Sequence, residues 1–192
     1  MHEKLFTKEN LIESLGSLVK PGGELEGLIE RLEKSGYFNA PASTRYHGAY
    51  PGGLLDHSMT MMMYLLRLTG ENQLVWEKPR SPYVIGLLHD MCKYDAYVVG
   101  ENGKISWNKN QRIKGHGEKS ARIAKILIPD LTEEEEDCIR YHMGAFCELP
   151  KGSVESMEIA KQWAEYTEAV HRHENVLWTH QADMLAAHVA NT

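Results

Sequence analysis

Six histidine and aspartate side chains, arranged along the chain in the order H…HD…H…H…D, have the types that bind a divalent metal ion: His57, His89, Asp90, His116, His142 and Asp183. Imidazole nitrogens and carboxylate oxygens together suit Mn, Fe, Ni, Co, Zn or Mg, and such a mixed set leaves coordination positions open for water. A metal-bound water loses its proton near neutral pH and becomes a hydroxide that can attack phosphorus. The residue types therefore predict one or two divalent ions and a hydrolytic reaction.

The local surroundings of these residues distinguish a metal site from a collection of packed core residues. A single His-Asp pair is weak evidence, because a histidine on an apolar helix is more often a buried packing residue. Here His89 and Asp90 follow an apolar run, residues 83–88, and His57 ends the run Gly-Gly-Leu-Leu-Asp-His. Asp183 lies in the last apolar segment, where a carboxylate is costly unless it is paired or bound to metal. These contexts favour the metal site.

The order of the six residues and the runs Gly-Gly-Leu-Leu-Asp-His-Ser-Met and Leu-Leu-His-Asp-Met-Cys-Lys resemble the HD superfamily of metal-dependent phosphohydrolases. The resemblance covers residues 45–188 and implies an all-α helical bundle in which several helices bring the ligands together. It implies four core metal ligands, with Asp90 bridging two ions where two are bound: His57, His89, Asp90 and Asp183. His116 and His142 match positions that hold a second metal in binuclear members and contact phosphate in mononuclear ones. Their joint presence favours two ions.

Several basic residues are candidates for holding a substrate phosphate. Lys93 matches the lysine of the family's HDxxK pattern, and the resemblance implies that it acts with Asp90 in catalysis by offsetting charge on a phosphate oxygen. The alternative is a partly exposed lysine at a helix end. Arg45 and His47 lie in a segment rich in Pro, Gly and Ala, and such loops often carry binding residues. An incidental surface loop is the alternative there, and Lys114 is a further candidate contact.

Residues 46–58, Tyr-His-Gly-Ala-Tyr-Pro-Gly-Gly-Leu-Leu-Asp-His-Ser, most resemble the branch of the superfamily that includes 3′–5′ exoribonucleases. Members of that branch typically carry an N-terminal OB-type module, whereas about 45 residues with helical patterning precede the motif here. The Gly-Tyr-Pro signature of cyclic-dinucleotide phosphodiesterases does not follow His142. We expect a phosphohydrolase of a nucleotide or a short nucleic-acid end. Two alternatives stay open: an HD-fold sensor that binds a nucleotide without turnover, and a di-iron HD oxygenase.

Composition narrows the class of protein and of partner. A chain of 192 residues, 42% hydrophobic and 25% charged, predicts one globular domain with a sizeable core. The formal charge of −6 argues against an extended nucleic-acid surface. The three cysteines, Cys92, Cys138 and Cys147, lack zinc-ribbon spacing and suit a reducing compartment. Neither a signal peptide nor a membrane span is predicted, so we expect a cytoplasmic protein without a membrane partner.

Hydrophobic periodicity predicts the helices that must bring the ligands together. Ser81-Pro82 predicts a helix start with Ser81 as the N-cap, and Thr132 with Glu135 predicts a capping box that also explains the acidic run 133–137. We expect a single HD domain over residues 1–192, with N-terminal packing helices in residues 1–40, an HD core over residues 45–188, and core helices at about 54–68, 115–128, 132–142 and from 153 onward.

A β-hairpin is predicted within the helical core at residues 97–107, because Asn102-Gly103 is a strong turn signal between two β-prone runs. The hairpin follows the His-Asp pair almost at once, so we expect it near the mouth of the site. A connection of only three residues separates the two helices that follow it, which predicts antiparallel packing. His116, at the start of one helix, and His142, near the end of the next, then face one point beside the His-Asp pair.

Overall fold

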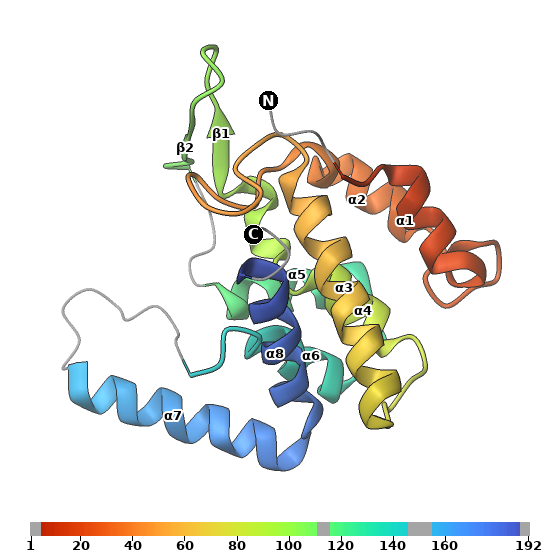
Figure 1. Ribbon diagram of the computed structural model, residues 1–192, viewed down its shortest axis with the longest axis vertical. Coiled ribbons are helices and arrows are strands. Elements are labelled where there is room, and N and C mark those ends of the chain that lie inside the picture. Colours follow the sequence, from red (N-terminus) through yellow and green to blue (C-terminus); the bar gives the residue numbers. More distant parts are fainter. Residues whose placement is uncertain (1–4, 111–115, 146–154, 189–192) are drawn as a thin grey trace.

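The structure is a computed structural model that describes residues 5–110, 116–145 and 155–188. Within these ranges it is mostly helical, with one two-stranded antiparallel sheet, which confirms the predicted all-α class with a small hairpin (Figure 1). No helix in these ranges is both long and apolar enough to cross a membrane. The elements in chain order are α1 (Lys8–Leu15), η1 (Gly16–Val19), α2 (Leu28–Ser35), η2 (Tyr37–Asn39), α3 (Gly53–Asn72), α4 (Ser81–Leu88), η3 (Met91–Asp95), β1 (Tyr97–Val99), β2 (Ile105–Trp107), α5 (Gly117–Leu127), α6 (Glu133–Arg140), α7 (Glu155–Arg172) and α8 (Asn175–His188).

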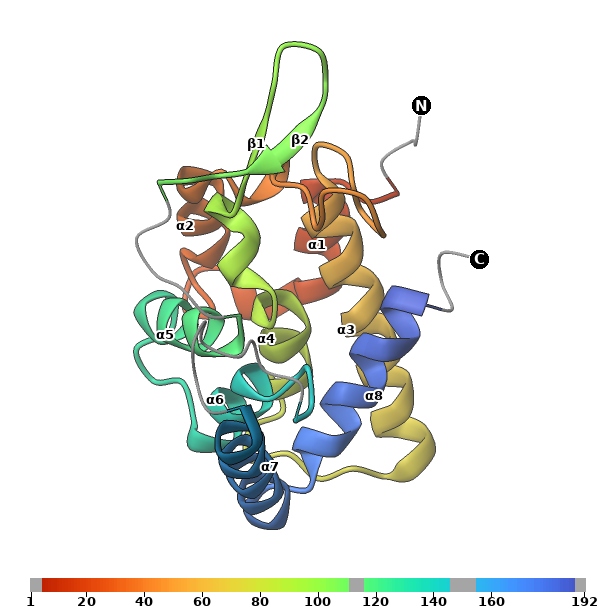
Figure 2. The same ribbon diagram turned by 90° about the vertical axis from the view of Figure 1, so that its left-hand side faces the viewer.

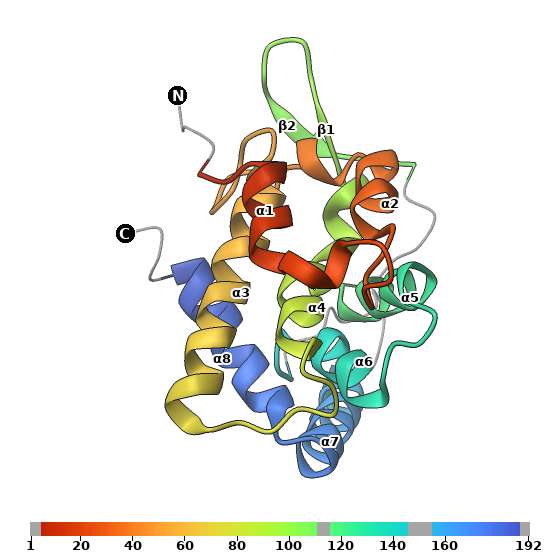
Figure 3. The same cartoon turned by 90° about the vertical axis from the view of Figure 1, so that its right-hand side faces the viewer.

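Helix α3 is central to the fold and packs against α4 and α8 (Figures 2 and 3). It is longer than the predicted 54–68 and ends at Asn72. Met59, Met61 and Met62 of α3 are buried in the core, whereas Met63 is exposed. Helix α4 is buried at nearly every position, because it lies between α3, α5 and α6. These helices form the rigid support of the candidate site.

Gly86 lets α3 and α4 cross closely. A Cβ atom at Gly86 would lie 2.5 Å from the Cα of Met62, which is far too short for a real contact. Any larger residue would therefore push the two helices apart. The crossing places the beginning of α3 beside the end of α4, where His57 and His89 lie.

The N-terminal helices cover one side of α3 and α4, as Figure 3 shows. The buried leucines of α1 and α2 belong to the same hydrophobic core as those of α3 and α4. The Asp56 carboxylate fastens the chain before α1 to the start of α3, because it accepts hydrogen bonds from the backbone N–H groups of Leu5 (2.9 Å) and Phe6 (2.8 Å). These contacts hold the first turns of α3 next to the N-terminal segment.

The hairpin forms where the sequence predicts it. Strands β1 and β2 pair antiparallel with Tyr97 opposite Trp107, and Gly103 adopts a left-handed φ of 73° in the turn. In Figure 1 the hairpin projects from the helical body, beside the segment that leads into α3. The pairing places Tyr97 and Trp107 at the end of the hairpin that is nearest to the helices.

Helix α6 begins as predicted and α4 does not. Thr132 and Glu135 form the capping box of α6. The prediction of Ser81 as the N-cap of α4 is wrong, since Ser81 is the first helical residue and Arg80 precedes it. The Ser81 hydroxyl instead donates to Glu135 (3.0 Å), and buried Arg80 pairs with the same carboxylate (3.3 Å). A buried carboxylate needs such donors, and this need outweighs the local capping preference.

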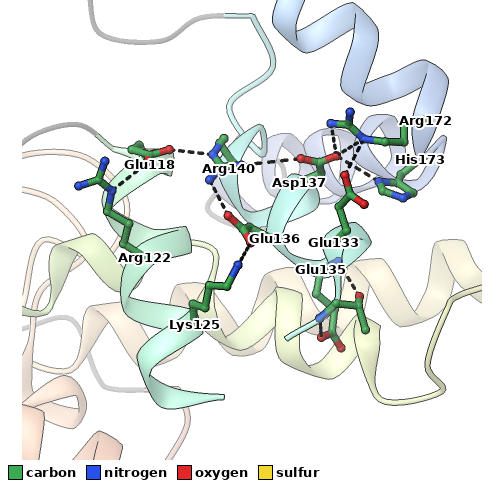
Figure 4. A network of polar contacts seen from close by, with 11 residues as sticks. Glu118, Arg122, Lys125, Glu133, Glu135, Glu136, Asp137, Arg140, Arg172 and His173 are labelled. Atoms are coloured by element: carbon green, nitrogen blue, oxygen red, sulfur yellow. Dashed lines mark hydrogen bonds and ion pairs between the residues drawn. The ribbon is translucent and has the colours of Figure 1, made fainter. Parts of the chain in front are cut away.

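The acidic run at the start of α6 does more than begin a helix. Figure 4 shows it in a network that ties α6 to α5 and to the end of α7. Glu136 pairs with Lys125 of α5 and with Arg140 of its own helix, both at 2.6 Å. Asp137 accepts from Arg172 (2.8 Å) and lies 3.1 Å from His173, just before α8 begins. The network therefore fixes the end of α7, and the chain that enters α8, relative to α6.

Candidate metal centre

Four ligand candidates come together from three helices to form what we call the His57 group: His57, His89, Asp90 and Asp183. His57 lies near the start of α3, His89 and Asp90 follow α4, and Asp183 lies within α8. The packing of α3 against both α4 and α8 brings these distant positions to one point.

The donor atoms of the His57 group have the spacing of a coordination sphere. His57 Nε2 lies 3.2 Å from Asp90 Oδ2, 3.1 Å from Asp183 Oδ1 and 3.1 Å from His89 Nε2. His89 Nε2 lies 3.6 Å from each of the two carboxylate oxygens. Donor atoms about 2.1 Å from a common ion lie roughly 3.0–3.5 Å from one another. The donor atoms of His57, His89 and Asp90 therefore fit a divalent metal ion, and Asp183 adjoins them through its contacts with the two histidines.

A second set, which we call the His116 group, shares Asp90 with the first: Asp90, His116 and His142. Asp90 Oδ1 lies 2.9 Å from His116 Nε2 and 3.6 Å from His142 Nε2, whereas Oδ2 faces the His57 group. Gly117 permits this arrangement, because a Cβ there would lie 1.9 Å from the Arg140 carbonyl oxygen at the end of α6. The two histidines thus meet beside Asp90, as the short connection between their helices predicts.

Hydrogen bonds to the backbone set the orientation of two ligand histidines. Nδ1 of His89 donates to the Gly86 carbonyl (2.9 Å), and Nδ1 of His142 donates to the Ile139 carbonyl (2.7 Å). With Nδ1 protonated, the neutral ring presents the Nε2 lone pair, which is the form that binds metal. Nε2 of His142 is buried and has no hydrogen bond. Buried polar atoms normally have a hydrogen-bond partner. A buried nitrogen that has none and lies beside a carboxylate therefore suits the role of a metal ligand.

The electrostatics of the His57 group favour cations. Burial opposes the ionisation of Asp90, but Lys93, His116 and His89 outweigh it and hold the pKa of Asp90 well below its usual value. Burial raises the pKa of Asp183, but the hydrogen bond with His57 and the nearby histidines lower it by more. The pKa of Asp183 is therefore also below its usual value. Two ionised carboxylates buried against the same histidine, His57, require compensating positive charge. Lys93 supplies part of it, with its ammonium 2.5 Å from Asp90 Oδ2.

Three of the histidines around Asp90 differ in their proton affinity. Burial lowers the pKa of His89 to about 3, so its ring is neutral at physiological pH. Burial also opposes protonation of His57, but hydrogen bonds to Asp183 and Asp90 prevail and raise its pKa. Burial is likewise outweighed at His116, where Cys92 and Asp90 raise the pKa to about 10. Cys92 Sγ lies 3.2 Å from His116 Nδ1.

Three members of the His57 group, namely His57, Asp90 and Asp183, line a pocket of about 300 Å³, and His89 is buried behind them. The hairpin contributes Tyr97 and Trp107 to the wall, which agrees with its predicted place near the mouth of the site. The ring of His47 lies 4.6 Å from that of His57, and burial lowers the pKa of His47 to about 4, so it is neutral at physiological pH. The lining residues are His47, His57, Asp90, Lys93, Tyr97, Trp107, His116, Met143, Asp183, Met184, Ala187 and His188.

The four residues predicted to contact the substrate do not all lie in the metal pocket. His47 and Lys93 line the metal pocket, whereas Arg45 lines a neighbouring groove and is exposed. Lys114 lies outside the described residues. His188, which no sequence pattern singled out, also lines the pocket. Sequence reasoning did not identify Trp107 as a residue of the pocket wall. The one feature that could have indicated it is its position at the end of a hairpin that follows the His-Asp pair.

Comparison of the chain with protein-family models, curated proteins and solved structures finds no match to any of them. The geometry of the described residues therefore carries the argument. It gives a mostly helical fold with a buried His/Asp cluster that is compatible with an HD-like metal site and could hold a metal ion.

Proposed function

We propose that this protein is a metal-dependent phosphohydrolase of the HD type, which hydrolyses a phosphoester of a nucleotide or a short nucleic-acid end. The observation that carries the proposal is a buried cluster in which the Nε2 atoms of His57 and His89 lie 3.1 Å apart and each lies 3.1–3.6 Å from the Asp90 and Asp183 carboxylates. Three of these four residues line an open pocket. The residue order that resembles the HD superfamily supports the same function.

The ligand set leaves room for chemistry as well as for binding. A divalent ion, once bound, supplies an acidic water and neutralises charge on phosphate oxygens. His57, His89, Asp90 and Asp183 hold the first ion, and the Oδ1 atom of Asp90 is turned toward the His116 group, which suits a second ion or a substrate phosphate.

Lys93 is the residue best placed to receive a phosphate oxygen. Its side chain is largely buried, it lines the pocket, and the nearby Asp90 carboxylate raises the pKa of its ammonium against the effect of burial. A cation held in this way stabilises the charge that develops on the phosphoryl oxygens. His47, neutral and at the pocket wall, is positioned to donate a hydrogen bond to the same group.

The test is a substrate panel run with one metal at a time. Purified protein loaded with Mn, Fe, Ni, Co, Zn or Mg is incubated with mono-, di-, tri- and cyclic nucleotides and with short oligonucleotides, and released phosphate or nucleotide is quantified. We expect turnover that requires the added ion and that EDTA removes. Asp183→Asn should lose turnover, whereas Asp130→Asn, which changes a mostly exposed carboxylate outside the pocket, should retain it.

Two results would overturn the proposal. Metal-loaded protein that binds nucleotides but releases no product from any of these substrates would show a sensor. Product formation that requires iron and dioxygen would show an oxygenase.

A further inference from the structure

We infer that a groove beside the metal pocket binds the next nucleotides of a single-stranded nucleic acid, so that the substrate is a strand end and not a free mononucleotide. That the strand is a substrate rests on the proposed function, whereas its binding in the groove does not. The groove, about 790 Å³ in volume, lies between residues 44–49 and the β2 side of the hairpin. Its lining residues are Thr44, Arg45, Tyr46, Ala49, Gly103, Lys104, Ile105, Ser106 and Trp107.

The charge of the groove is opposite to that of the whole chain. Arg45 and Lys104 line it and no carboxylate does, although the chain has a formal charge of −6. Within the described part of the chain neither residue forms an ion pair, whereas Lys34 and Arg67 on the surface each pair with a glutamate. Two uncommitted cations on either side of a groove suit the phosphates of a nucleic-acid backbone.

The groove also has exposed aromatic rings. Tyr46 is 81% exposed and Trp107 is 59% exposed, on opposite sides of the groove. Large aromatic side chains in contact with water suit base stacking, which contributes about 1–3 kcal/mol for each base in single-strand binding proteins. Basic groups interleaved with stacking rings are the combination that binds a strand without reading its sequence.

Trp107 connects the groove to the metal pocket, because it lines both. A phosphoester held at Lys93 therefore has a continuous path along Trp107 toward Arg45 and Lys104. Figure 2 shows the hairpin above the segment that leads into α3. Residues from both of these segments line the groove. A mononucleotide would occupy the metal pocket and leave the cationic groove unused.

The test separates binding from turnover. Wild-type protein in EDTA is titrated with a fluorescein-labelled single-stranded hexamer, and unlabelled oligo(dT) and oligo(rU) of one to six residues compete for it, with anisotropy as the readout. We expect affinity to rise by about fivefold or more with the second nucleotide and then to level off as the groove is filled. Equal affinity for oligo(dT) and oligo(rU) indicates recognition by stacking and charge. Tighter binding of one of them identifies the strand as DNA or as RNA.

Matched variants locate the binding in the groove. Trp107→Ala should weaken hexamer binding by about tenfold, whereas Trp163→Ala, which removes a similarly exposed ring on α7, should leave it unchanged. Arg45→Ala and Lys104→Ala should each lower the salt dependence, the slope of log K against log salt, by about 0.7. Lys34→Ala is the control for loss of one surface cation.

The possible failures are distinguishable. Affinity that does not depend on oligomer length, or an acidic peptide that competes as well as the hexamer, overturns the groove. Length-dependent binding that Trp107→Ala weakens, in a protein that releases no product with any metal, supports the groove and overturns the proposed hydrolase. Turnover of mononucleotides and hexamers at equal efficiency, with no effect of Trp107→Ala on hexamer binding, supports the hydrolase and overturns the groove.

Discussion

The two groups that share Asp90 differ in how the fold holds them. The His57 group is set on α3 and α8 and at the end of α4, and the side chains of His57, His89 and Asp90 are at most 2% exposed. In the His116 group, His116 precedes α5 and its side chain is 23% exposed. In the first group His57 and Asp183 lie within packed helices, whereas both histidines of the second group lie outside helices, beside the ends of α5 and α6.

The groups also differ in charge. The His57 group offers two carboxylates, those of Asp90 and Asp183, while the His116 group has only the shared oxygen of Asp90. The pKa of His116 is raised to about 10 and that of His57 is also raised, so an ion bound at either group displaces a proton. We therefore expect the His57 group to bind the first ion more tightly and the His116 group to bind a second ion more weakly.

The largest predicted effect follows from removing the carboxylate that both groups share. Asp90→Ala should lose all bound metal and reduce turnover to the background of the assay. His142→Ala should keep the ion of the His57 group and lose only the second, because His142 faces Oδ1 of Asp90. Metal content is measured by elemental analysis after dialysis against metal-free buffer. Full metal content in Asp90→Ala would contradict the assignment of both groups.

The crossing of α3 and α4 gives the next largest effect. Gly86→Ala puts a Cβ 2.5 Å from Met62 Cα, and such overpacking costs about 1–3 kcal/mol and separates His57 from His89. Gly70→Ala is the matched control, because Gly70 lies in α3 with no atom within 4 Å of its added Cβ. It should stabilise the protein by about 0.5–1 kcal/mol. Urea unfolding and metal retention check both variants, and equal stability of the two would rule out a tight crossing.

The residues that cluster in the candidate site were predictable because chemistry restricts the residue types. Asp183 is an example: a carboxylate in an apolar segment needs a partner, and the structure places it 3.1 Å from His57 Nε2. The antiparallel placement of His116 and His142 followed from a short connection. Local signals were also sufficient for the hairpin turn and for the capping box of α6.

Features that depend on distant contacts were not predictable from local patterns. Ser81 has the sequence context of an N-cap, but its hydroxyl donates a hydrogen bond to Glu135, which is far away along the chain. The acidic run was attributed to a helix start, although Asp137 in fact holds the segment before α8. The groove beside the pocket depends on where the hairpin lies relative to residues 44–49, and no spacing in the sequence specifies that.

A smaller effect is expected from the ion pair between Asp137 of α6 and Arg172, which ends α7 shortly before α8 begins. Helix α8 carries Asp183 but neither histidine of the His116 group. Asp137→Asn removes the charge of a buried carboxylate that accepts from Arg172 (2.8 Å), and we expect a loss of about 1–2 kcal/mol in unfolding free energy. Glu133→Gln removes a mostly exposed partner of the same arginine, 3.4 Å away, and should cost at most about 0.5 kcal/mol. Thermal unfolding measures both, and a larger loss in Glu133→Gln would contradict the role of Asp137.

The finest test of the difference between the groups is the pH dependence of the second ion. His116 carries a proton below a pKa of about 10, and a metal ion needs the Nε2 lone pair, so binding releases that proton. Apparent affinity for the second ion should therefore rise about tenfold per pH unit between pH 6 and pH 8. Cys92→Ala removes one of the two groups that raise this pKa and should flatten the slope for the second ion only, because Cys92 contacts His116 and not the His57 group. Calorimetric titrations in buffers of different ionisation enthalpy count the released protons, and a second step that releases none would show that the proton on His116 does not limit binding.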